Sequence, residues 1–336
     1  MATNAFGIDL GTNNIKIYSR SDDHILVEKN MIAIENKNTL FAYGDSAFEM
    51  YEKAPGNIHI SYPLSNGVIA DIKNMEMLVR YFINDLQRGN SKPADFFIAV
   101  PTDVTEVEKR AFYDLIRDAG VKAKKIMVVE KAVADGLGLD IDVKNSQGVL
   151  VVNVGYETTE ISILSLGGIV LSRLIKTGGL KFDESIRATV RKEFSLIIGG
   201  KTAETVKVSL CELEKEGKGA LVYGRDIVTG LPVEREIPTK LVDECLEEHF
   251  DTIIDNVRVI LERTPPELAA DIYRNGVYLT GGASQVSHLA ERLGAGTGLK
   301  INRAEEPMTS TVYGLSKIIK DENYKSVAYA IEGMSK

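Results

Sequence analysis

Two short stretches of the chain combine a glycine turn with polar side chains of the kind that hold phosphate groups. The first, GIDLGTNNIKIYS (residues 7–19), leaves a buried apolar run at Gly11, and the second, VVNVGYETTEISIL (residues 151–164), does so at Gly155. Glycine lets backbone N–H groups approach phosphate oxygens closely, and neighbouring hydroxyls and amides add further donors. We therefore expect each stretch to be a β-hairpin that contacts a phosphorylated ligand.

The two stretches also resemble each other. At an offset of 144 positions, Asp9 aligns with Asn153 and Gly11 aligns with Gly155. Two such hairpins, one in each half of the chain, could close on a ligand between them. Chance similarity between two hairpins is the alternative at this point.

Strands and helices alternate around these hairpins. FFIAV (residues 96–100) and KIMVV (125–129) read as buried strands, and between them Thr105 and Glu108 have the spacing of a helix capping box. Late in the chain, GVYLT (276–280) runs into Gly-Gly-Ala-Ser and then a helix-like segment, a join that suits contact with phosphate or a flat ligand. The spacing of apolar residues thus alternates between a period of 2, typical of strands, and a period of 3.6, typical of helices, which predicts α/β layers.

Composition narrows the class of protein. The chain has 336 residues, 44% of them apolar and 26% charged, which predicts a globular protein of two domains. The net charge of −8 argues against a nucleic-acid-binding surface. Cys211 and Cys245 form no CxxC motif, so we expect reduced thiols, and the four histidines are scattered rather than clustered. We expect no signal peptide, no membrane-spanning segment and a cytoplasmic location.

Together these segments resemble the actin-like ATPase superfamily and, within it, the bacterial actin MreB over nearly the whole chain. Stretches similar to MreB occur in the family's order: GIDLGTNN, APGNIHISYPLSNGVIAD (54–71), VPTDVTEVEKRAFYDLIRDAG (100–120), ISILSLGGIVLSR (161–173), GRDIVTGLP (224–232) and TPPELAADIYRNGVYLTGGAS (264–284).

The resemblance implies an α/β, actin-like ATPase fold with a nucleotide cleft between two ribonuclease-H-like domains. Each domain is expected to carry a small inserted subdomain. The first domain is expected at residues 1–143 plus about 315–336, with its small subdomain at about 32–77. The second is expected at 144–314, with its small subdomain at about 181–245.

The resemblance also implies which residues hold ATP or ADP with Mg²⁺. Asp9 and Asn153 would hold the metal through water. Lys16 is either a phosphate contact, as in actin, or an exposed hairpin lysine. The nucleotide-binding set is expected to be Asp9, Gly11, Thr12, Asn13, Asn14, Lys16, Asn153, Gly155, Tyr156, Glu157, Thr158, Glu204, Lys207, Gly281, Gly282, Ala283 and Ser284, with Glu130, Lys131 and Thr158 at the catalytic positions.

The chain departs from the family where hydrolysis takes place. MreB usually has Asp-Ile-Gly-Gly-Gly at the second hairpin, where this chain has Asn153-Val-Gly-Tyr-Glu. The family's water-positioning glutamate is replaced by Lys131, which cannot accept a proton while it carries its own. Asp135 also falls in a helix that usually has small residues there. These changes put both Mg²⁺ binding and hydrolysis in doubt.

The net charge near the γ-phosphate changes accordingly. Glutamate to lysine adds two units, aspartate to asparagine adds one and glycine to glutamate subtracts one, which gives +2. Lys131 could then replace part of the Mg²⁺ field and hold a triphosphate without turnover. It could instead pair with Glu157 and plug an empty site, or the changes could be neutral drift on a working ATPase.

We expect a cytoskeletal protein that polymerises alone or with an active MreB paralogue and guides cell-wall synthesis and cell shape. Two other hypotheses stay open. One is an active ATPase in which Glu130 or Glu160 replaces the missing base, and the other is a regulatory nucleotide-binding module that does not polymerise.

MreB proteins usually dock on the inner face of the membrane through an apolar loop near residues 87–95. This chain has QRGNSKPAD there, so membrane contact should be weak or indirect.

Overall fold

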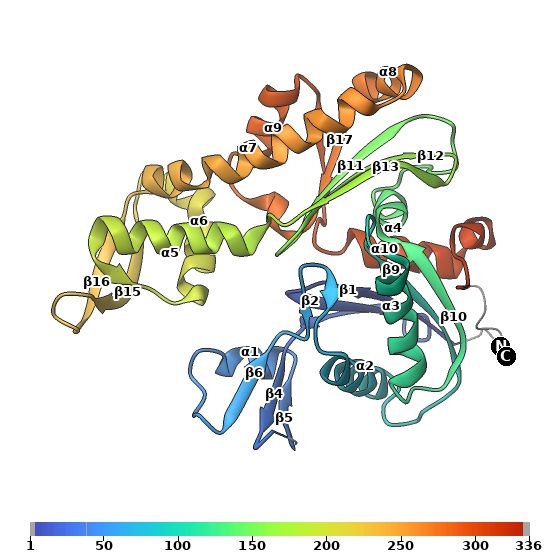
Figure 1. Cartoon of the computed structure of the whole chain (residues 1–336), viewed down its shortest axis with the longest axis horizontal. Coiled ribbons are helices and arrows are strands. Elements are labelled where there is room, and N and C mark those ends of the chain that lie inside the picture. Colours follow the sequence, from blue (N-terminus) through green and yellow to red (C-terminus); the bar gives the residue numbers. More distant parts are fainter. Residues whose placement is uncertain (1–3, 38, 332–336) are drawn as a thin grey trace.

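The computed structural model describes residues 4–37 and 39–331, so the outermost residues of the expected first domain, 1–3 and 332–336, lie outside the description. The chain forms two lobes (Figure 1). We call residues 4–139 together with 310–331 the first lobe, and residues 149–303 the second lobe.

The first lobe is built on a five-stranded sheet. Its strands, in spatial order, are β10 (Ala123–Glu130), β9 (Ala94–Val100), β1 (Ala5–Leu10), β2 (Asn14–Ser19) and β3 (His24–Lys29). A small sheet joins β5 (Thr39–Tyr43), β4 (Ile32–Glu35) and β6 (Ile58–Ser61), and β7 (Leu64–Ser65) pairs with β8 (Val68–Ile69). The helical elements are α1 (Asp45–Met50), α2 (Ile72–Leu86), α3 (Glu106–Asp118), α4 (Lys131–Gly138), α10 (Ser310–Lys320) and the 3₁₀ helix η2 (Glu322–Val327).

The second lobe repeats this plan. Its main sheet has the order β13 (Gly168–Ile175), β12 (Thr159–Ser165), β11 (Val149–Val154), β17 (Val277–Thr280) and β18 (Ile301–Arg303), and its small sheet has β14 (Leu196–Ile197), β15 (Ala220–Asp226) and β16 (Pro232–Ile237). The helical elements are α5 (Gly179–Phe194), α6 (Gly200–Glu216), α7 (Thr239–Arg263), α8 (Pro266–Asn275), the 3₁₀ helix η1 (Gly282–Gln285) and α9 (Leu289–Thr297).

The two main sheets share strand order and direction. In each, three antiparallel strands begin the sheet and two parallel strands complete it, so β1–β2 corresponds to β11–β12. The faint sequence repeat therefore reflects a repeated architecture, and the expected α/β, actin-like fold with two similar domains is confirmed. Both predicted hairpins are present.

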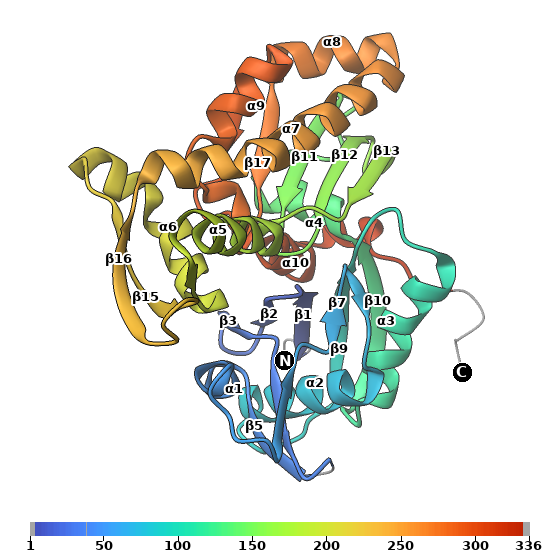
Figure 2. The ribbon, with the colours of Figure 1, turned by 60° about the vertical axis from the view of Figure 1, so that its left-hand side comes forward.

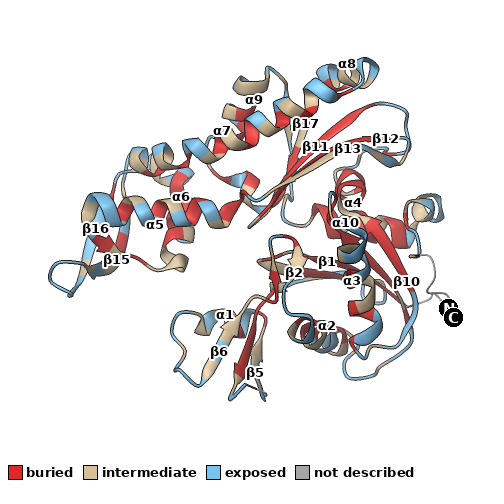
Figure 3. Cartoon of the chain, viewed as in Figure 1, coloured by how far each residue is buried: buried red, intermediate tan, exposed pale blue. Residues whose placement is uncertain are grey.

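Alternation along the strands explains the layers. In β1, Phe6 and Ile8 face the core under α2 and α3, whereas Ala5 faces a core shared with α4 and α10. That second core also contains Val149 and Val151 from the second lobe, so apolar burial joins the lobes. Figure 3 shows the buried residues concentrated in the main sheets and in α4 and α10.

Local signals place most elements correctly. Thr105 and Glu108 form the predicted capping box, and α3 begins immediately after Thr105. One helix begins later than its sequence pattern suggests, because η1 and the left-handed residue His288 precede α9. The expected boundary after residue 314 falls inside α10, which packs against α4 (Figure 2).

Candidate functional site

A cavity of about 430 Å³ lies between the lobes, where the two hairpins face each other. Most of the sequence-predicted binding residues line it. These are Asp9, Gly11, Thr12, Asn13, Asn14, Lys16, Lys131, Asn153, Gly155, Tyr156, Thr158, Glu204, Lys207, Gly281, Gly282 and Ala283. Glu130, Glu157 and Ser284 do not line the cavity, for reasons given below.

The first hairpin holds an ion pair across its two strands. Asp9 lies opposite Lys16 in the strand register, and Lys16 Nζ lies 2.8 Å from Asp9 Oδ2. Lys16 is 8% exposed, so the interpretation as an exposed hairpin lysine is wrong. Burial alone would raise the pKa of Asp9, but Lys16 and Lys131 hold that pKa below its usual value. Asp9 is therefore an ionised carboxylate already paired with a cation.

The second hairpin is tied to the helix that follows it. Gly155 N–H donates to Thr158 O (2.8 Å), while the carbonyls of Gly155 and Tyr156 accept from Gly179 N (3.0 Å) and Leu180 N (2.7 Å). The beginning of α5 thus fixes the turn. The hydroxyl-bearing Thr158 is buried at the wall of the cavity.

Lys131 pairs with Glu160 rather than with Glu157. Lys131 Nζ lies 3.0 Å from Glu160 Oε1, and Glu160 Oε2 accepts from the backbone N–H and the hydroxyl of Thr102, at 3.1 and 3.2 Å. The expected alternative in which Glu157 neutralises Lys131 is therefore wrong. Burial disfavours the ammonium, but Glu160, Asp9 and Asp135 raise the pKa of Lys131 above its usual value.

Glu130 faces away from the cavity. Its Oε1 accepts from Lys109 Nζ (2.9 Å) and from the Tyr329 hydroxyl (2.7 Å) on the outer side of the first lobe. Neither glutamate proposed as a replacement base is free, since both Glu160 oxygens are also engaged.

Asp135 explains why residue 153 is an asparagine. The buried Asp135 carboxylate accepts from Asn153 Nδ2 (2.7 Å) and from the Thr311 hydroxyl (2.6 Å), which joins α4 to β11 and α10. Burial raises the pKa of Asp135 to about 6, although Lys131 and the two donors oppose this. A second carboxyl group at position 153 would face Asp135 at hydrogen-bond distance, and ionising both groups there would cost free energy. The carboxylate of this pair therefore belongs to Asp135, which does not line the cavity, whereas Asn153 does.

The remaining wall comes from α6 and the β17–η1 join. Lys207 Nζ lies 2.7 Å from Asp183 Oδ1, and burial raises the pKa of Asp183 to about 6. Gly281 has φ +91, and a Cβ there would lie 2.3 Å from Val154 O, so this close approach requires glycine. Ser284 turns inward, where its hydroxyl donates to Gly281 O (2.7 Å).

Sequence reasoning missed several residues of the cavity. Lys29, the last residue of β3, donates to Asn13 Oδ1 (3.2 Å), and burial lowers the pKa of Lys29. The sequence could have indicated Lys29, because a third antiparallel strand after the first hairpin places Lys29 opposite Asn14. Other lining residues that the sequence analysis did not name are Leu64, Gly67, Gly179, Val208, Gln285, Pro307, Met308 and Thr311.

These residues fit a divalent metal poorly. Mg²⁺ prefers carboxylate and carbonyl oxygens, but Asp9 is paired with Lys16, and Asn153, whose Nδ2 donates to Asp135, offers only a neutral amide oxygen. Among residues 4–37 and 39–331, no group of three histidine, cysteine or carboxylate side chains is arranged to bind a metal. The cationic groups suit an anionic ligand better.

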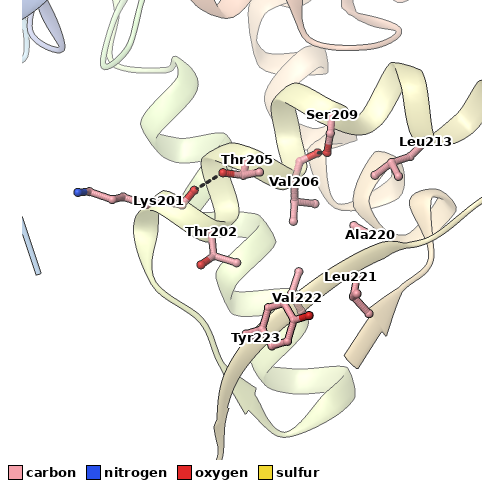
Figure 4. A pocket seen from close by; sticks show the side chains of 10 residues that line it. All are labelled: Lys201, Thr202, Thr205, Val206, Ser209, Leu213, Ala220, Leu221, Val222 and Tyr223. Carbon is pink, nitrogen blue, oxygen red and sulfur yellow. Dashed lines mark hydrogen bonds between the residues drawn. The ribbon is translucent and has the colours of Figure 1, made fainter. Parts of the chain in front are cut away.

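A second hollow lies between α6 and β15 and has a volume of about 410 Å³ (Figure 4). Two of its hydroxyls are used within α6: Thr205 donates to Lys201 O (2.9 Å) and Ser209 to Val206 O (3.2 Å). The Lys201 side chain points away from the other labelled residues (Figure 4). This hollow therefore lacks converging polar groups, and the cavity between the lobes is the candidate site.

None of the helices in the described part of the chain has both the length and the apolar character needed to cross a bilayer.

Comparisons with known proteins point to one family. A family model described as MreB/Mbl protein matches residues 3–327. The cell shape-determining protein Mbl of Bacillus subtilis is 34% identical over 312 residues, 92% of this chain and 93% of Mbl. The cell shape-determining protein MreB of Escherichia coli is 33% identical over 329 residues, 95% of this chain and 94% of MreB.

Solved structures agree. MreB5 of Spiroplasma citri bound to ADP superposes with a TM-score of 0.88 at 33% identity, covering 97% of this chain and 98% of MreB5. The MamK double helical filament superposes with a TM-score of 0.77 over 95% of this chain and 99% of MamK, at 20% identity, which shows the shared fold.

Proposed function

The chain belongs to the MreB/Mbl family, and we propose that it is a filament-forming cytoskeletal protein that binds ATP or ADP and hydrolyses ATP weakly or not at all. The observation that carries the second half of this proposal is the Lys131–Glu160 ion pair at the cavity wall. It places a fixed ammonium group where the family usually has the carboxylate that positions water.

Charge at the cavity supports binding of a nucleotide. Four lysines line it (Lys16, Lys29, Lys131 and Lys207) against three carboxylates (Asp9, Glu160 and Glu204), so the lining carries a net charge of 4 − 3 = +1. One unit charge about 5 Å from another contributes roughly 3 kcal/mol at an effective dielectric constant near 20. The MreB5 relative was solved with ADP and with AMPPNP.

The same residues argue against efficient hydrolysis. A general base needs a lone pair within reach of the attacking water. Lys131 is protonated, Glu160 is already bonded through both oxygens, and Glu130 faces the outer side of the lobe. Asp9 is paired with Lys16, so bound nucleotide should depend little on Mg²⁺.

A nucleotide titration with and without Mg²⁺ tests the binding proposal. We expect ATP and ADP to bind with dissociation constants that change less than about threefold when the metal is removed. Loss of ATP binding on chelation of Mg²⁺ would contradict metal-independent binding. Phosphate release by the wild type, beside a typical MreB as the control, tests the rest, and turnover equal to that of the control would show a working ATPase.

Assembly is tested by sedimentation and electron microscopy with ATP, ADP and no nucleotide. We propose filaments of this chain alone, or mixed filaments with an active MreB paralogue, that guide cell-wall synthesis proteins and cell shape from the cytoplasm. Contact with the inner face of the membrane would then go through a partner. A chain that binds ATP but stays monomeric in both mixtures would be a regulatory module instead.

A further inference from the structure

Tyr156 and Glu157 of the second hairpin reach across to the first lobe. The Tyr156 ring lies 6.2 Å from the Tyr62 ring, centroid to centroid, at an interplanar angle of 41°. One carboxylate oxygen of Glu157 accepts from the backbone N–H of Asn66, in the turn between β7 and β8. These two residues are thus engaged with protein groups of the opposite lobe.

The partners in the first lobe are held in place for this contact. The Tyr62 hydroxyl lies 3.4 Å from Asn13 Oδ1, at the first hairpin. Asn66 has φ +51, a left-handed conformation, and lies in the turn of the β7–β8 ladder, where Leu64 pairs with Ile69 and Ser65 with Val68. Burial raises the pKa of Tyr62 and of Tyr156, so both rings stay neutral and pack as aromatic surfaces.

A second contact between the lobes joins α1 and the turn after it to the beginning of α6. Gly200 N–H donates to Glu52 Oε2 (3.2 Å) at the beginning of α6, where a carboxylate is favoured by the helix dipole. Lys201 Nζ lies 4.2 Å from the centroid of the Phe48 ring and donates to the Phe48 carbonyl. The lobes therefore touch at two places on the same side of the cavity.

We propose that Tyr156 and Glu157 are a latch that keeps the cleft closed in the absence of nucleotide and slows exchange once nucleotide is bound. All contacts of the latch are between protein groups, so closure needs no ligand. The hydrogen bond is charge-assisted, although Asn66 is exposed, and the aromatic pair is half-buried, so the two contacts together favour the closed arrangement. The exchange half of the proposal rests on the nucleotide binding proposed above, whereas the closure half does not.

Small-angle scattering of the nucleotide-free monomer tests closure directly. We expect the wild type to have the same radius of gyration with and without ADP, and Tyr156→Gly/Glu157→Gly to expand measurably when free. Tyr62→Leu removes the partner of Tyr156 on the opposite lobe, and its radius of gyration should increase in the same way. This variant shows that the expansion does not come from a local defect in the second hairpin. Glu248→Gln, an exposed α7 position, is the matched control and should scatter like the wild type.

Release of a fluorescent ADP analogue tests exchange. The double glycine variant should release it about ten times faster than the wild type, and Glu157→Gln, which keeps an acceptor oxygen, should fall between the two. If the nucleotide-free variants have the same radius of gyration as the nucleotide-free wild type, the latch proposal is wrong. A wild type that binds no nucleotide would instead contradict the proposed function, and the scattering would still decide the latch.

Discussion

Glu160 lies opposite Asn153 in the second hairpin, just as Lys16 lies opposite Asp9 in the first. Both Glu160 and Lys16 form an ion pair with a residue of the opposite charge. Lys16 bonds its own facing residue, Asp9, at 2.8 Å. Glu160 bonds Lys131 from the other lobe at 3.0 Å, because its facing residue is an amide committed to Asp135. The hairpins are therefore related in backbone but differ in charge, because the Asp9–Lys16 pair is neutral (−1 + 1 = 0) and the Asn153–Glu160 pair carries 0 − 1 = −1. Four predictions depend on this arrangement and its supports.

Removing the ammonium of Lys131 should leave Glu160 buried without its partner. We expect Lys131→Met to lower the free energy of unfolding by about 3–5 kcal/mol in chemical denaturation, the usual result of breaking a buried pair. Lys131→Met/Glu160→Gln should recover more than half of that loss. The control is Lys215→Met, which breaks the exposed pair with Glu212 and should change stability by less than about 0.5 kcal/mol. Equal effects at the two sites would contradict the buried pair.

Restoring the family's aspartate should fail while Asp135 is present. Asn153→Asp places two carboxylates within hydrogen-bond distance in a buried site, so we expect a loss of about 2–4 kcal/mol of unfolding free energy at neutral pH. Asp135→Asn/Asn153→Asp exchanges the two groups and should regain most of it. The exchanged variant should also bind ATP more tightly when Mg²⁺ is present, because its carboxylate now lies at the cavity wall. If Asp135→Asn/Asn153→Asp recovers neither unfolding free energy nor ATP affinity, then Asp135 and Asn153 are not interchangeable as a carboxylate–amide pair.

The raised pKa of Asp135 should make part of the stability depend on pH. The pKa of Asp135 is 3.8 in the unfolded chain and about 6 in the folded chain, so the folded state binds the Asp135 proton more tightly. This contribution is complete below pH 4, falls as pH rises through 6, and amounts to on the order of 3 kcal/mol. The unfolding free energy of the wild type minus that of Asp135→Ala should fall by this amount between pH 4 and pH 7. A difference that stays constant would mean that Asp135 titrates normally.

The contact between α4 and α10 should tolerate no side chain. A Cβ on Gly314 would lie 1.8 Å from Ala134 O, so we expect Gly314→Ala to cost more than about 3 kcal/mol or to prevent folding. Gly56→Ala is the matched control, because a Cβ there meets no atom within 4 Å and the backbone is not left-handed. Thermal unfolding of both variants measures the difference, and similar melting temperatures would contradict the close contact.

The α/β layers and the two hairpins followed from local patterns, whereas the actin-like fold and its cleft followed from the resemblance to MreB. Asp9 and Asn153 could be placed on two similar hairpins from strand composition, glycine turns and the 144-residue offset. The spacing of Thr105 and Glu108 was enough to predict the beginning of α3. Partner choice was not predictable in this way. Glu160 lies in β12 and Glu157 in the turn before it, and which of the two meets Lys131 is decided by packing between the lobes.

Two further residues show the same limit. Asp135 reads in sequence as a misplaced charge in a helix of small residues, and only its distances to Asn153 and Thr311 show that it is fully satisfied. Glu130 follows a buried strand as a catalytic residue would, yet its side chain is drawn outward by Lys109 and Tyr329, which are distant in sequence.

The glycine contact between α4 and α10 has a mechanical consequence. With Gly138 and Gly314 setting backbone against backbone, neither helix can slide along the other without a collision, so α4 and α10 form one rigid unit within the first lobe. Val149 and Val151 of the second lobe pack on this unit, and both small sheets lie well away from it (Figure 1). A small rotation of the second lobe against this unit therefore becomes a large displacement where Glu52 meets Gly200.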